Sequence, residues 1–485
     1  MKKVIVIGGG ISGLTCAIYL KLNDYDVEIY EKNHYAGGFL TSWSRKGSII
    51  DGCLHWLLGT KKGTKINKIW DTVGDINSTE IITTESFYDT YYDGEVFHLY
   101  NDIDKFEKEL YKFSKNDDDE IKALIEAIKA LGSPEIPSDL PYELVNPRDL
   151  AMDKQILRKT IAYMKISVHD LAMRFNSPII RYSFLNSLVN EKFNAFYFLT
   201  TLANLMTGNA SLPKGGSHTL RDRMVNKFIN LGGKIFYNSD VSEIIIEENK
   251  AKGIIVNNEK HYADYVVGAC DVHYTYNVLL KNQYPMDPYV EMNNDKVKYP
   301  DYSFIIASYR TKHDFKGEIC QLIKVEPYHI LGKEYDYLSV RAYDYDETLM
   351  NGDYRTVQVM LTTYDEEYDY INKLSDAEYE NMKKEVGKLY QEMLEKQYND
   401  SFELLDVLTP KTYERYNHSF RGTFMTYALT PKTQQMVRSM LIDGLDNFVM
   451  SNQWLYLPGG TPAAVVNGKF ACQIILYKDE RDYKI

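Results

Sequence analysis

Three glycines near the start of the chain constrain its fold more than any other feature. Gly8, Gly10 and Gly13 follow the apolar run Lys3–Ile7 with the spacing G-x-G-x-x-G. That run is typical of a strand buried on both faces of a parallel sheet. Apolar residues then recur at roughly helical spacing over 14–22. The glycines therefore lie at a strand-to-helix turn, the context in which this motif predicts dinucleotide binding.

Each glycine of the motif has its own physical task. The first permits the tight turn, the second lets the backbone approach a pyrophosphate, and the third lets the helix pack on the strand. The phosphates then face free N–H groups at the positive end of the helix dipole. A second expected strand, Asp26–Tyr30, ends at Glu31, at about the distance where an acidic residue binds an adenosine ribose. The alternative is a glycine-rich turn of an unrelated α/β protein, with an incidental surface glutamate.

Composition and net charge limit which binding partners and which cellular compartment we expect for the protein. The 485 residues fit two or three domains. A net charge of −12 gives no electrostatic footprint for nucleic acid and disfavours attraction to anionic lipid. No leader precedes the first strand and no apolar run approaches about 18 residues, so we expect neither a signal peptide nor a spanning helix. The scattered cysteines lack C-x-x-C spacing, so we expect no disulfide framework, no metal site and a reduced, cytoplasmic setting. They are Cys16, Cys53, Cys270, Cys320 and Cys472.

The pattern of elements predicts a discontinuous nucleotide-binding domain. The pattern of glycine turns, helices and short strands that is typical of a nucleotide-binding domain begins again at Pro213, with a helix ending at Gly232 and Gly233. It appears once more as a strand, glycine loop and helix over 447–476. Further strands are expected over 235–237, 241–247, 252–256 and 265–268, and helices over 116–131 and 376–398, with a proline-bearing connection over 133–147. We therefore predict an α/β fold with a Rossmann-type domain (1–79, 213–276 and 423–485) and an inserted mixed α+β substrate-binding domain (80–212 and 277–422).

Five separate blocks carry a resemblance to a known family. They are AGGFLTSW from Ala36, IIDG from Ile49, PKGGSHTL from Pro213, LTPKTYERY from Leu408 and QWLYLPGGTPAAVVNGK from Gln453. Together these blocks resemble the phytoene desaturase and retinol saturase-like branch of the flavin-dependent oxidoreductases, which is related to the flavin amine oxidases. The resemblance covers nearly the whole chain and is weakest in the two segments of the expected substrate-binding domain.

The resemblance implies FAD as the cofactor. It places the pyrophosphate over the first glycines, the ribose on Glu31, adenine on the backbone of Val241, and the isoalloxazine ring near 37–42 and 459–464. A terminal helix beginning near Pro462 would point its positive end at the flavin. The implied cofactor-binding residues are Gly8, Gly10, Ile11, Ser12, Gly13, Glu31, Lys32, Gly37, Gly38, Thr41, Ser42, Val241, Asn452, Gly459, Gly460, Pro462, Ala463 and Ala464.

Some positions depart from the family pattern. Asn452 stands where glycine is usual, Ala463 fills a position often occupied by glycine, and Asn467 replaces a usual serine. We expect these changes to alter the surroundings of the flavin without abolishing binding. Phe39 occupies the place of an arginine frequent in amine oxidases, which disfavours that activity. A single G-x-G-x-x-G favours tightly bound FAD without a dedicated NAD(P)H domain.

The resemblance implies hydride transfer at flavin N5 with a carbon of an apolar polyene, isoprenoid or lipid-like substrate, in carotenoid or lipid metabolism. Desaturation, saturation and flavin-assisted double-bond isomerisation all fit. Apolar helical stretches at 179–188 and 196–206 either line a substrate tunnel or form ordinary core. Catalytic residues are not identifiable; the candidates are His55, Trp56, Arg415 and Tyr416.

Two other functions stay open. A flavin amine oxidase would use oxygen and release peroxide, and a non-catalytic carrier of the GDP-dissociation-inhibitor type would share the fold. Peripheral membrane contact fits an apolar substrate, whereas the oligomeric state, the electron donor or acceptor and the direction of the reaction do not follow from the sequence.

Overall fold

A five-stranded parallel sheet organises the nucleotide-binding half of the molecule, with β1 at its centre. Its order is β10-β2-β1-β14-β20. The computed structural model describes all residues except 133–134, 136, 146–152, 435–436 and 485. The central position of β1 brings the glycine turn to the middle of the carboxyl edge of the sheet, as the Rossmann-type fold requires. The strands are β1 (Lys3–Ile7), β2 (Asp26–Tyr30), β10 (Lys234–Phe236), β14 (Tyr265–Gly268) and β20 (Phe448–Met450).

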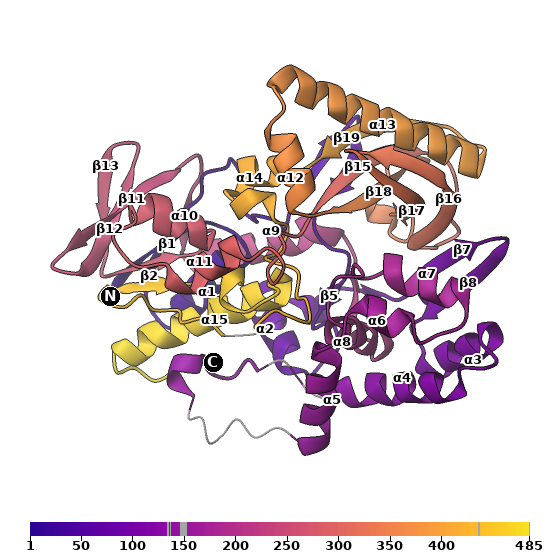
Figure 1. The fold of residues 1–485 in the computed structure, drawn as a ribbon. Helices are drawn as coiled ribbons and strands as arrows, with labels where there is room; N and C mark the ends of the chain where they lie inside the picture. The colour runs from indigo at the N-terminus through magenta and orange to yellow at the C-terminus, as the bar shows by residue number, and fades with distance from the viewer. Residues whose placement is uncertain (133–134, 136, 146–152, 435–436, 485) are drawn as a thin grey trace.

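Helices pack together against this sheet, and α1 and α15 make the closest approach. A Cβ atom added at Gly468 would lie 2.6 Å from the carbonyl oxygen of Ser12, so the bare backbone of α15 lets the two helices touch. The yellow α15 lies beside α1 in Figure 1. The helices are α1 (Ile11–Leu22), α2 (Lys65–Gly74), α9 (Gly216–Asn230) and α15 (Gly460–Lys478).

Small sheets complete this half. An antiparallel meander, β11 to β13, contacts β14, and a hairpin, β3 and β4, follows the second glycine pair. A third small sheet has the order β5-β9-β6. The strands are β3 (Ser42–Arg45), β4 (Ser48–Asp51), β5 (Leu57–Leu58), β6 (Ile81–Ile82), β9 (Ala210–Pro213), β11 (Val241–Glu247), β12 (Lys250–Val256) and β13 (Glu259–Tyr262).

The second half is built on a seven-stranded mixed sheet of order β19-β15-β18-β17-β16-β7-β8. Its neighbours are antiparallel except β16 and β7, which run parallel. The long helix α13 (Asp376–Tyr398) covers one face of this sheet (Figure 1). The strands are β7 (Ser86–Tyr92), β8 (Glu95–Tyr100), β15 (Ser303–Thr311), β16 (Cys320–Ile330), β17 (Lys333–Ala342), β18 (Arg355–Thr363) and β19 (Phe402–Leu408).

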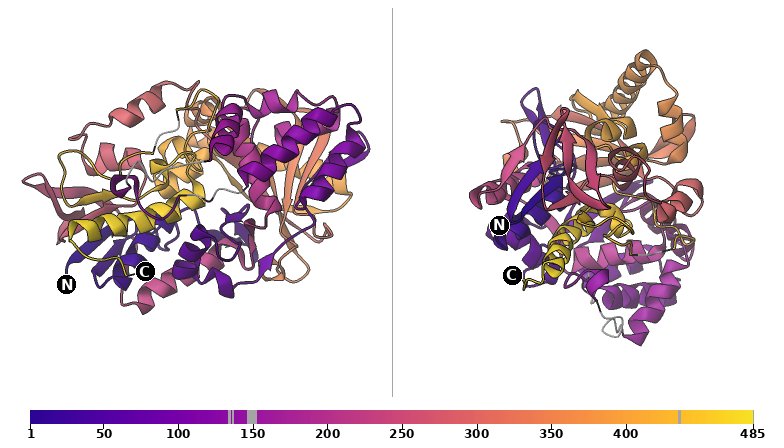
Figure 2. Two further views of the ribbon diagram at one scale, coloured as in Figure 1. Left: turned by 90° about the horizontal axis from the view of Figure 1, so that it is seen from below. Right: turned by 90° about the vertical axis from the view of Figure 1, so that its left-hand side faces the viewer.

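A group of helices lies beside β7 and β8, and Figure 2 shows it on the side of the orange strands away from α13. These helices are α3 (Ile103–Phe113), α4 (Asp118–Leu131), α5 (Lys154–Met164), α6 (Val168–Ala172), α7 (Pro178–Asn186) and α8 (Ala195–Met206). Shorter helices near the junction of the halves are α10 (Val272–Tyr274), α11 (Asp287–Asn294), α12 (Asp365–Asn372) and α14 (Pro410–Asn417).

The expected elements are present, some with the predicted ends, such as the strands over 241–247 and 265–268 and the helix over 376–398, and others with shifted ends. The helix expected over 116–131 begins at Asp118, the strand expected over 252–256 begins at Lys250, and the strand expected over 235–237 is Lys234–Phe236. The terminal helix, expected to begin near Pro462, begins at Gly460. Part of the expected connection over 133–147 falls outside the described residues.

Two further observations concern the described residues alone. No helix among them combines the length and apolar character needed to cross a bilayer. All five cysteines have free thiols.

Candidate functional site

One cavity of about 710 Å³ runs from the glycine turn to an aromatic chamber under the seven-stranded sheet. This volume lies within the usual range for small-molecule sites. At one end it is lined by Gly8, Gly10 and Glu31, and at the other by side chains such as Tyr302 and Phe304. A ligand that fills the whole cavity therefore contacts both halves of the molecule.

The glycine turn is shaped for close backbone approach. A Cβ atom at Gly13 would lie 2.1 Å from the carbonyl oxygen of Gly8, so the third glycine allows the helix to pack on the turn. A Cβ atom at Gly10 would find its nearest neighbour, the carbonyl oxygen of Gly37, at 3.9 Å. The space next to Gly10 is therefore part of the cavity, and a ligand rather than a packed protein atom can occupy it.

Glu31 is fixed at the end of β2 by backbone donors. Its carboxylate accepts hydrogen bonds from Gly9 N and Asn33 N, both at 2.8 Å, and the residue is 4% exposed. Burial raises the pKa of this carboxyl, while the hydrogen bonds oppose the shift. The carboxylate still borders the cavity, so its remaining lone pairs can accept from ligand hydroxyls.

The start of α15 forms the facing wall. Gly459 has φ +84° and Gly460 φ +80°, so this turn uses backbone conformations that side chains disfavour. Asn452, 4% exposed, also lines the cavity, and its Nδ2 has no hydrogen-bond partner. A buried amide donor without a partner is costly, which indicates that a ligand acceptor belongs beside it.

The structure brings most of the expected cofactor-binding residues to this one cavity and leaves three outside its lining. Gly13 packs the helix against the turn, and Thr41 and Ser42 lead into the β3–β4 hairpin. The expected residues that line the cavity are Gly8, Gly10, Ile11, Ser12, Glu31, Lys32, Gly37, Gly38, Val241, Asn452, Gly459, Gly460, Pro462, Ala463 and Ala464.

The four catalytic candidates do not lie together. His55 and Trp56 line the chamber, where the His55 ring stacks with Phe424 at 5.8 Å between ring centroids. Arg415 and Tyr416 lie at the nucleotide end instead: the carbonyl of Arg415 accepts from Lys32 Nζ at 3.0 Å, and that of Tyr416 accepts from Asn33. These contacts place both residues beside Lys32 and Asn33 rather than in the chamber.

His55 is uncharged in this setting. Desolvation by burial, with the nearby positive charge of Arg341, lowers the pKa of its imidazole to about 3. A pKa this low makes His55 a weak base and leaves no imidazolium at neutral pH.

One face of the seven-stranded sheet forms the chamber wall. Successive side chains of a strand point to opposite faces, and the inward set comes from several strands. The other face carries aliphatic residues that pack under α13. The inward residues are Phe304 on β15, Met360 and Thr362 on β18, Tyr337, Ser339 and Arg341 on β17, and Tyr88 on β7.

Sequence reasoning missed this wall and also the buried Asp271. The carboxylate of Asp271 accepts from Trp454 Nε1 at 2.8 Å and from Phe420 N at 3.0 Å, which joins the segment after β14 to two loops that line the cavity. No motif marks it. The Asp93-Gly94 turn between alternating apolar runs was a signal for the β7–β8 hairpin that went unused.

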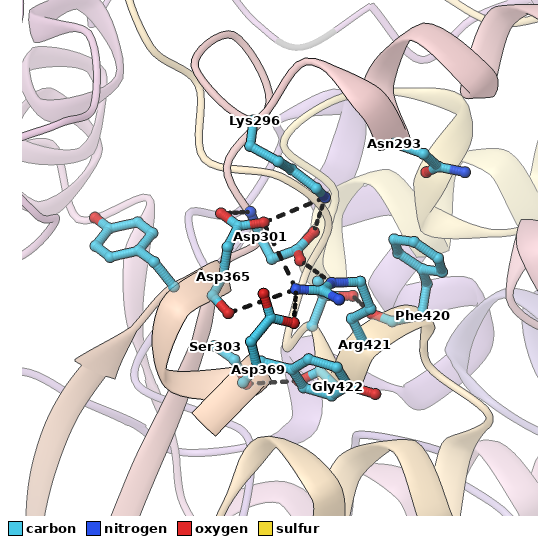
Figure 3. A network of polar contacts seen from close by, with 12 residues as sticks. Asn293, Lys296, Asp301, Ser303, Asp365, Asp369, Phe420, Arg421 and Gly422 are labelled. Atoms are coloured by element: carbon cyan, nitrogen blue, oxygen red, sulfur yellow. Dashed lines mark hydrogen bonds and ion pairs between the residues drawn. The ribbon is translucent and has the colours of Figure 1, made fainter. Parts of the chain in front are cut away.

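An ion network anchors the segment 418–425 beside the cavity (Figure 3). Arg421 pairs with Asp301 and, at 2.9 Å, with Asp369, while Lys296 pairs with Asp301 at 2.7 Å and Asp365 at 3.3 Å. Three carboxylates thus meet two cations. Burial and the neighbouring Asp301 raise the pKa of Asp365 well above its usual range.

These features fit FAD on structural grounds alone. Gly10 provides a cradle that a Cβ atom would fill, Glu31 presents buried acceptors for ribose hydroxyls, and Asn452 holds an unpartnered donor at the opposite wall. The helix α1 directs its N-terminal N–H groups at the same space, which suits a pyrophosphate.

Comparison with known proteins gives the family. The chain is 24% identical over 307 residues to a 1-hydroxycarotenoid 3,4-desaturase of a Flavobacterium species, a match that covers 58% of this chain and 59% of the relative. It is 24% identical over 456 residues to prolycopene isomerase 2 of an Oncidium hybrid cultivar, covering 87% and 74%. An oxidoreductase from Methanosarcina mazei shares the fold, with a TM-score of 0.62, 17% identity and coverage of 97% and 100%.

This chain spans only about half to three fifths of the length of several curated relatives, the 1-hydroxycarotenoid 3,4-desaturase among them. The family profile, in contrast, matches nearly the whole chain, over residues 11–476. That profile describes flavin-containing amine oxidoreductases, and the fold and cavity described above agree with it. The chain belongs to the flavin-containing amine oxidoreductase family.

Proposed function

We propose that the protein is an FAD-dependent oxidoreductase that acts on carbon–carbon bonds of an apolar polyene, isoprenoid or lipid-like substrate. The observation that carries the proposal is the continuous cavity, which joins the nucleotide-binding glycines to an aromatic chamber. The named activities of the relatives, carotenoid desaturation and prolycopene isomerisation, support it. Bound FAD would supply hydride transfer at its N5 atom; the protein supplies binding and orientation.

The chamber residues orient the substrate and exclude water. Phe304 contacts Phe424 at 5.3 Å between ring centroids and His55 at 5.9 Å, both edge to face, so a cluster of aromatic rings lines this part of the cavity. Such a surface binds a flat conjugated chain through apolar contact. We propose that neutral His55 contributes packing here rather than acid catalysis, because its lowered pKa leaves no imidazolium.

Some residues that line the cavity are both apolar and exposed, and we propose that this part of the protein rests on a membrane surface. Leu140, Tyr142 and Tyr456 line the cavity and are also exposed. On α5, Leu157 and Ile161 are exposed four residues apart, beside Arg158 and Lys159. An exposed apolar patch with basic neighbours suits a lipid interface, from which an apolar substrate enters directly.

Flotation with liposomes tests the membrane proposal. Wild-type protein should float with the vesicles, and the L157E/I161E double variant should stay in the lower fraction with unchanged FAD content. Recovery of the wild type entirely in the lower fraction contradicts the proposal.

The division into a FAD-binding domain (1–79, 213–276 and 423–485) and a substrate-binding domain (80–212 and 277–422) also stays a proposal. The parallel sheet draws its strands from the first set and the seven-stranded sheet from the second. Expression of 80–212 joined to 277–422 by a short linker tests whether the second set folds alone; an unfolded product contradicts autonomy.

Product analysis distinguishes the proposed reaction from amine oxidation. FAD-loaded protein is incubated with a polyene hydrocarbon in vesicles, once with a quinone acceptor and once after reduction of the flavin, and the products are separated by mass and by isomer. The matched control is Phe304→Trp, which fills the chamber and leaves the glycine turn unchanged. Unaltered polyenes together with peroxide from amines would establish the amine oxidase alternative.

A further inference from the structure

Arg341 is a buried cation that lines the chamber without an ionic partner. The residue is 3% exposed and borders the cavity from β17. Among the described residues no carboxylate lies within 4.0 Å of its guanidinium. Burying a charge is expensive unless an opposite charge or a full set of acceptors compensates it, so this arginine needs a counter-ion that the protein itself does not provide.

The contacts of Arg341 hold it in place without neutralising it. Nη2 donates to the carbonyl oxygens of His55 at 2.9 Å and Leu54 at 3.3 Å, and Nη1 donates to Cys320 Sγ at 3.4 Å. Its Nε has no partner. Because burial raises the pKa of the Cys320 thiol, that sulfur is neutral. The guanidinium is therefore positioned by dipoles and by the Tyr343 ring, 5.3 Å from Cζ to the ring centroid, and keeps its full charge.

Asp51, a buried carboxylate close to the chamber, does not serve this purpose. Asp51, at the end of β4, already accepts from Ser217 Oγ at 2.6 Å, Ser217 N at 2.7 Å, Cys53 N at 3.0 Å and Leu54 N at 3.2 Å. Its oxygens are occupied by these donors, and no ion pair joins it to Arg341 among the described residues.

Neutral donors surround the guanidinium on the chamber side. Ser339 precedes Arg341 by two residues on β17, so both side chains lie on the same face of the strand and line the cavity. Tyr88 lines it from β7, and burial raises the pKa of its hydroxyl, which stays protonated. A planar cation with two neutral hydroxyls matches the geometry of a carboxylate.

We propose that the chamber binds an apolar chain that ends in a carboxylate, with that end held by Arg341 and the chain directed along the aromatic wall. The inference rests on the proposed function and specifies its substrate class. Apolar side chains such as Phe304 and Met360 lie on the same wall and contact the chain. An uncharged hydrocarbon would leave the buried guanidinium without a counter-ion.

A fluorescent polyene acid tests the inference by binding alone. FAD-loaded protein is titrated with cis-parinaric acid and with its methyl ester, which has the same chain without the charge. We expect the acid to bind about tenfold or more tightly than the ester. Stearic acid as competitor distinguishes the sources of the carboxylate: displacement indicates a general fatty-acid site, whereas retained parinarate indicates that the polyene chain is also required.

Variants locate the charge. Arg341→Gln should bind acid and ester equally, and Arg341→Lys should keep part of the preference. Arg438 is also buried, lines the cavity and has an unpartnered Nε, so Arg438→Gln tests the other buried arginine. This variant should keep the preference, and its loss here but not in Arg341→Gln would overturn the assignment to Arg341. Equal binding of acid and ester by wild type, or a preference that survives Arg341→Gln, overturns the inference.

Two readouts guard against ambiguity. If Arg341→Gln fails to fold, a pH titration of wild type replaces it: acid binding should fall toward that of the ester as the ligand carboxylate protonates, and parallel behaviour of acid and ester contradicts the inference. Because binding requires no turnover, conversion of hydrocarbons without acid preference overturns this inference alone. Acid preference without any polyene conversion instead overturns the proposed function.

Discussion

The two ends of the cavity bind their ligands by different means. At the nucleotide end the backbone forms the contact surface, since Gly8, Gly10, Gly459 and Gly460 line it. At the chamber end the surface consists of side chains from one face of a mixed sheet, such as Phe304. A backbone surface requires glycines at fixed spacing, whereas a side-chain surface accepts many residue combinations. The first is therefore readable as a motif and the second is not.

The largest expected effect is on FAD affinity at the nucleotide end of the cavity, where the backbone forms the contact surface. Gly10→Ala adds a Cβ atom that meets no protein atom within 3.9 Å but occupies the ligand space. We expect FAD affinity to fall roughly 100-fold, the upper range of an overpacking cost, while the apoprotein keeps its thermal midpoint. Isothermal titration of apoprotein with FAD measures this. Ile11→Val, which keeps the backbone, is the control, and equal losses in both variants would break the comparison.

A tenfold effect is expected for Glu31, a buried side chain that lines the nucleotide end. Glu31→Gln removes a buried carboxylate that accepts from Gly9 N, and a hydrogen bond to a charged group contributes about 1.5 kcal/mol or more. The pKa of Glu31 is raised by burial, so FAD affinity of wild type should fall as the pH decreases toward that raised value. Titrations at several pH values should show this fall for wild type and its absence for Glu31→Gln.

A smaller effect concerns stability beside the chamber. The raised pKa of Asp365 means that its protonated form is favoured in the folded state. The contribution of Asp365 to the free energy of unfolding is present below the usual carboxyl pKa. It is lost as the pH rises through the raised value. Asp365→Asn, which resembles the protonated form, should therefore gain stability relative to wild type, of the order of 1 kcal/mol, at the upper end of that window. Denaturant unfolding at a series of pH values measures the difference; a constant difference across the window contradicts the assignment.

The smallest effect would sharpen the side-chain end. Met360→Leu conserves volume on the chamber wall, and such swaps usually cost less than about 1.5 kcal/mol. We expect FAD affinity to stay unchanged while the relative turnover of polyenes of different length shifts. Competition between two polyenes, followed by product ratios, measures the shift. An altered FAD affinity would show that the two ends are not independent.

The difference between the backbone surface of the nucleotide end and the side-chain surface of the chamber also explains which parts of the structure could be predicted from the sequence. The strand Lys3–Ile7, the helix Asp376–Tyr398 and the Rossmann-type fold were predicted because local apolar periodicity and glycine spacing specify them. Arg341 and Asp271 were not, because their importance arises only when distant strands and loops assemble around one cavity. Arg415 was a candidate through a local motif, and a motif does not show that the residue lies beside Lys32 at the nucleotide end.

The most direct test of the account is the visible spectrum of the FAD-loaded protein during titration with an apolar polyene under anaerobic conditions. We predict a saturable perturbation of the flavin bands with one polyene per protein, absent in Phe304→Trp although that variant retains FAD. Polyene binding that leaves the flavin spectrum unchanged would contradict the claim that one cavity brings cofactor and substrate together.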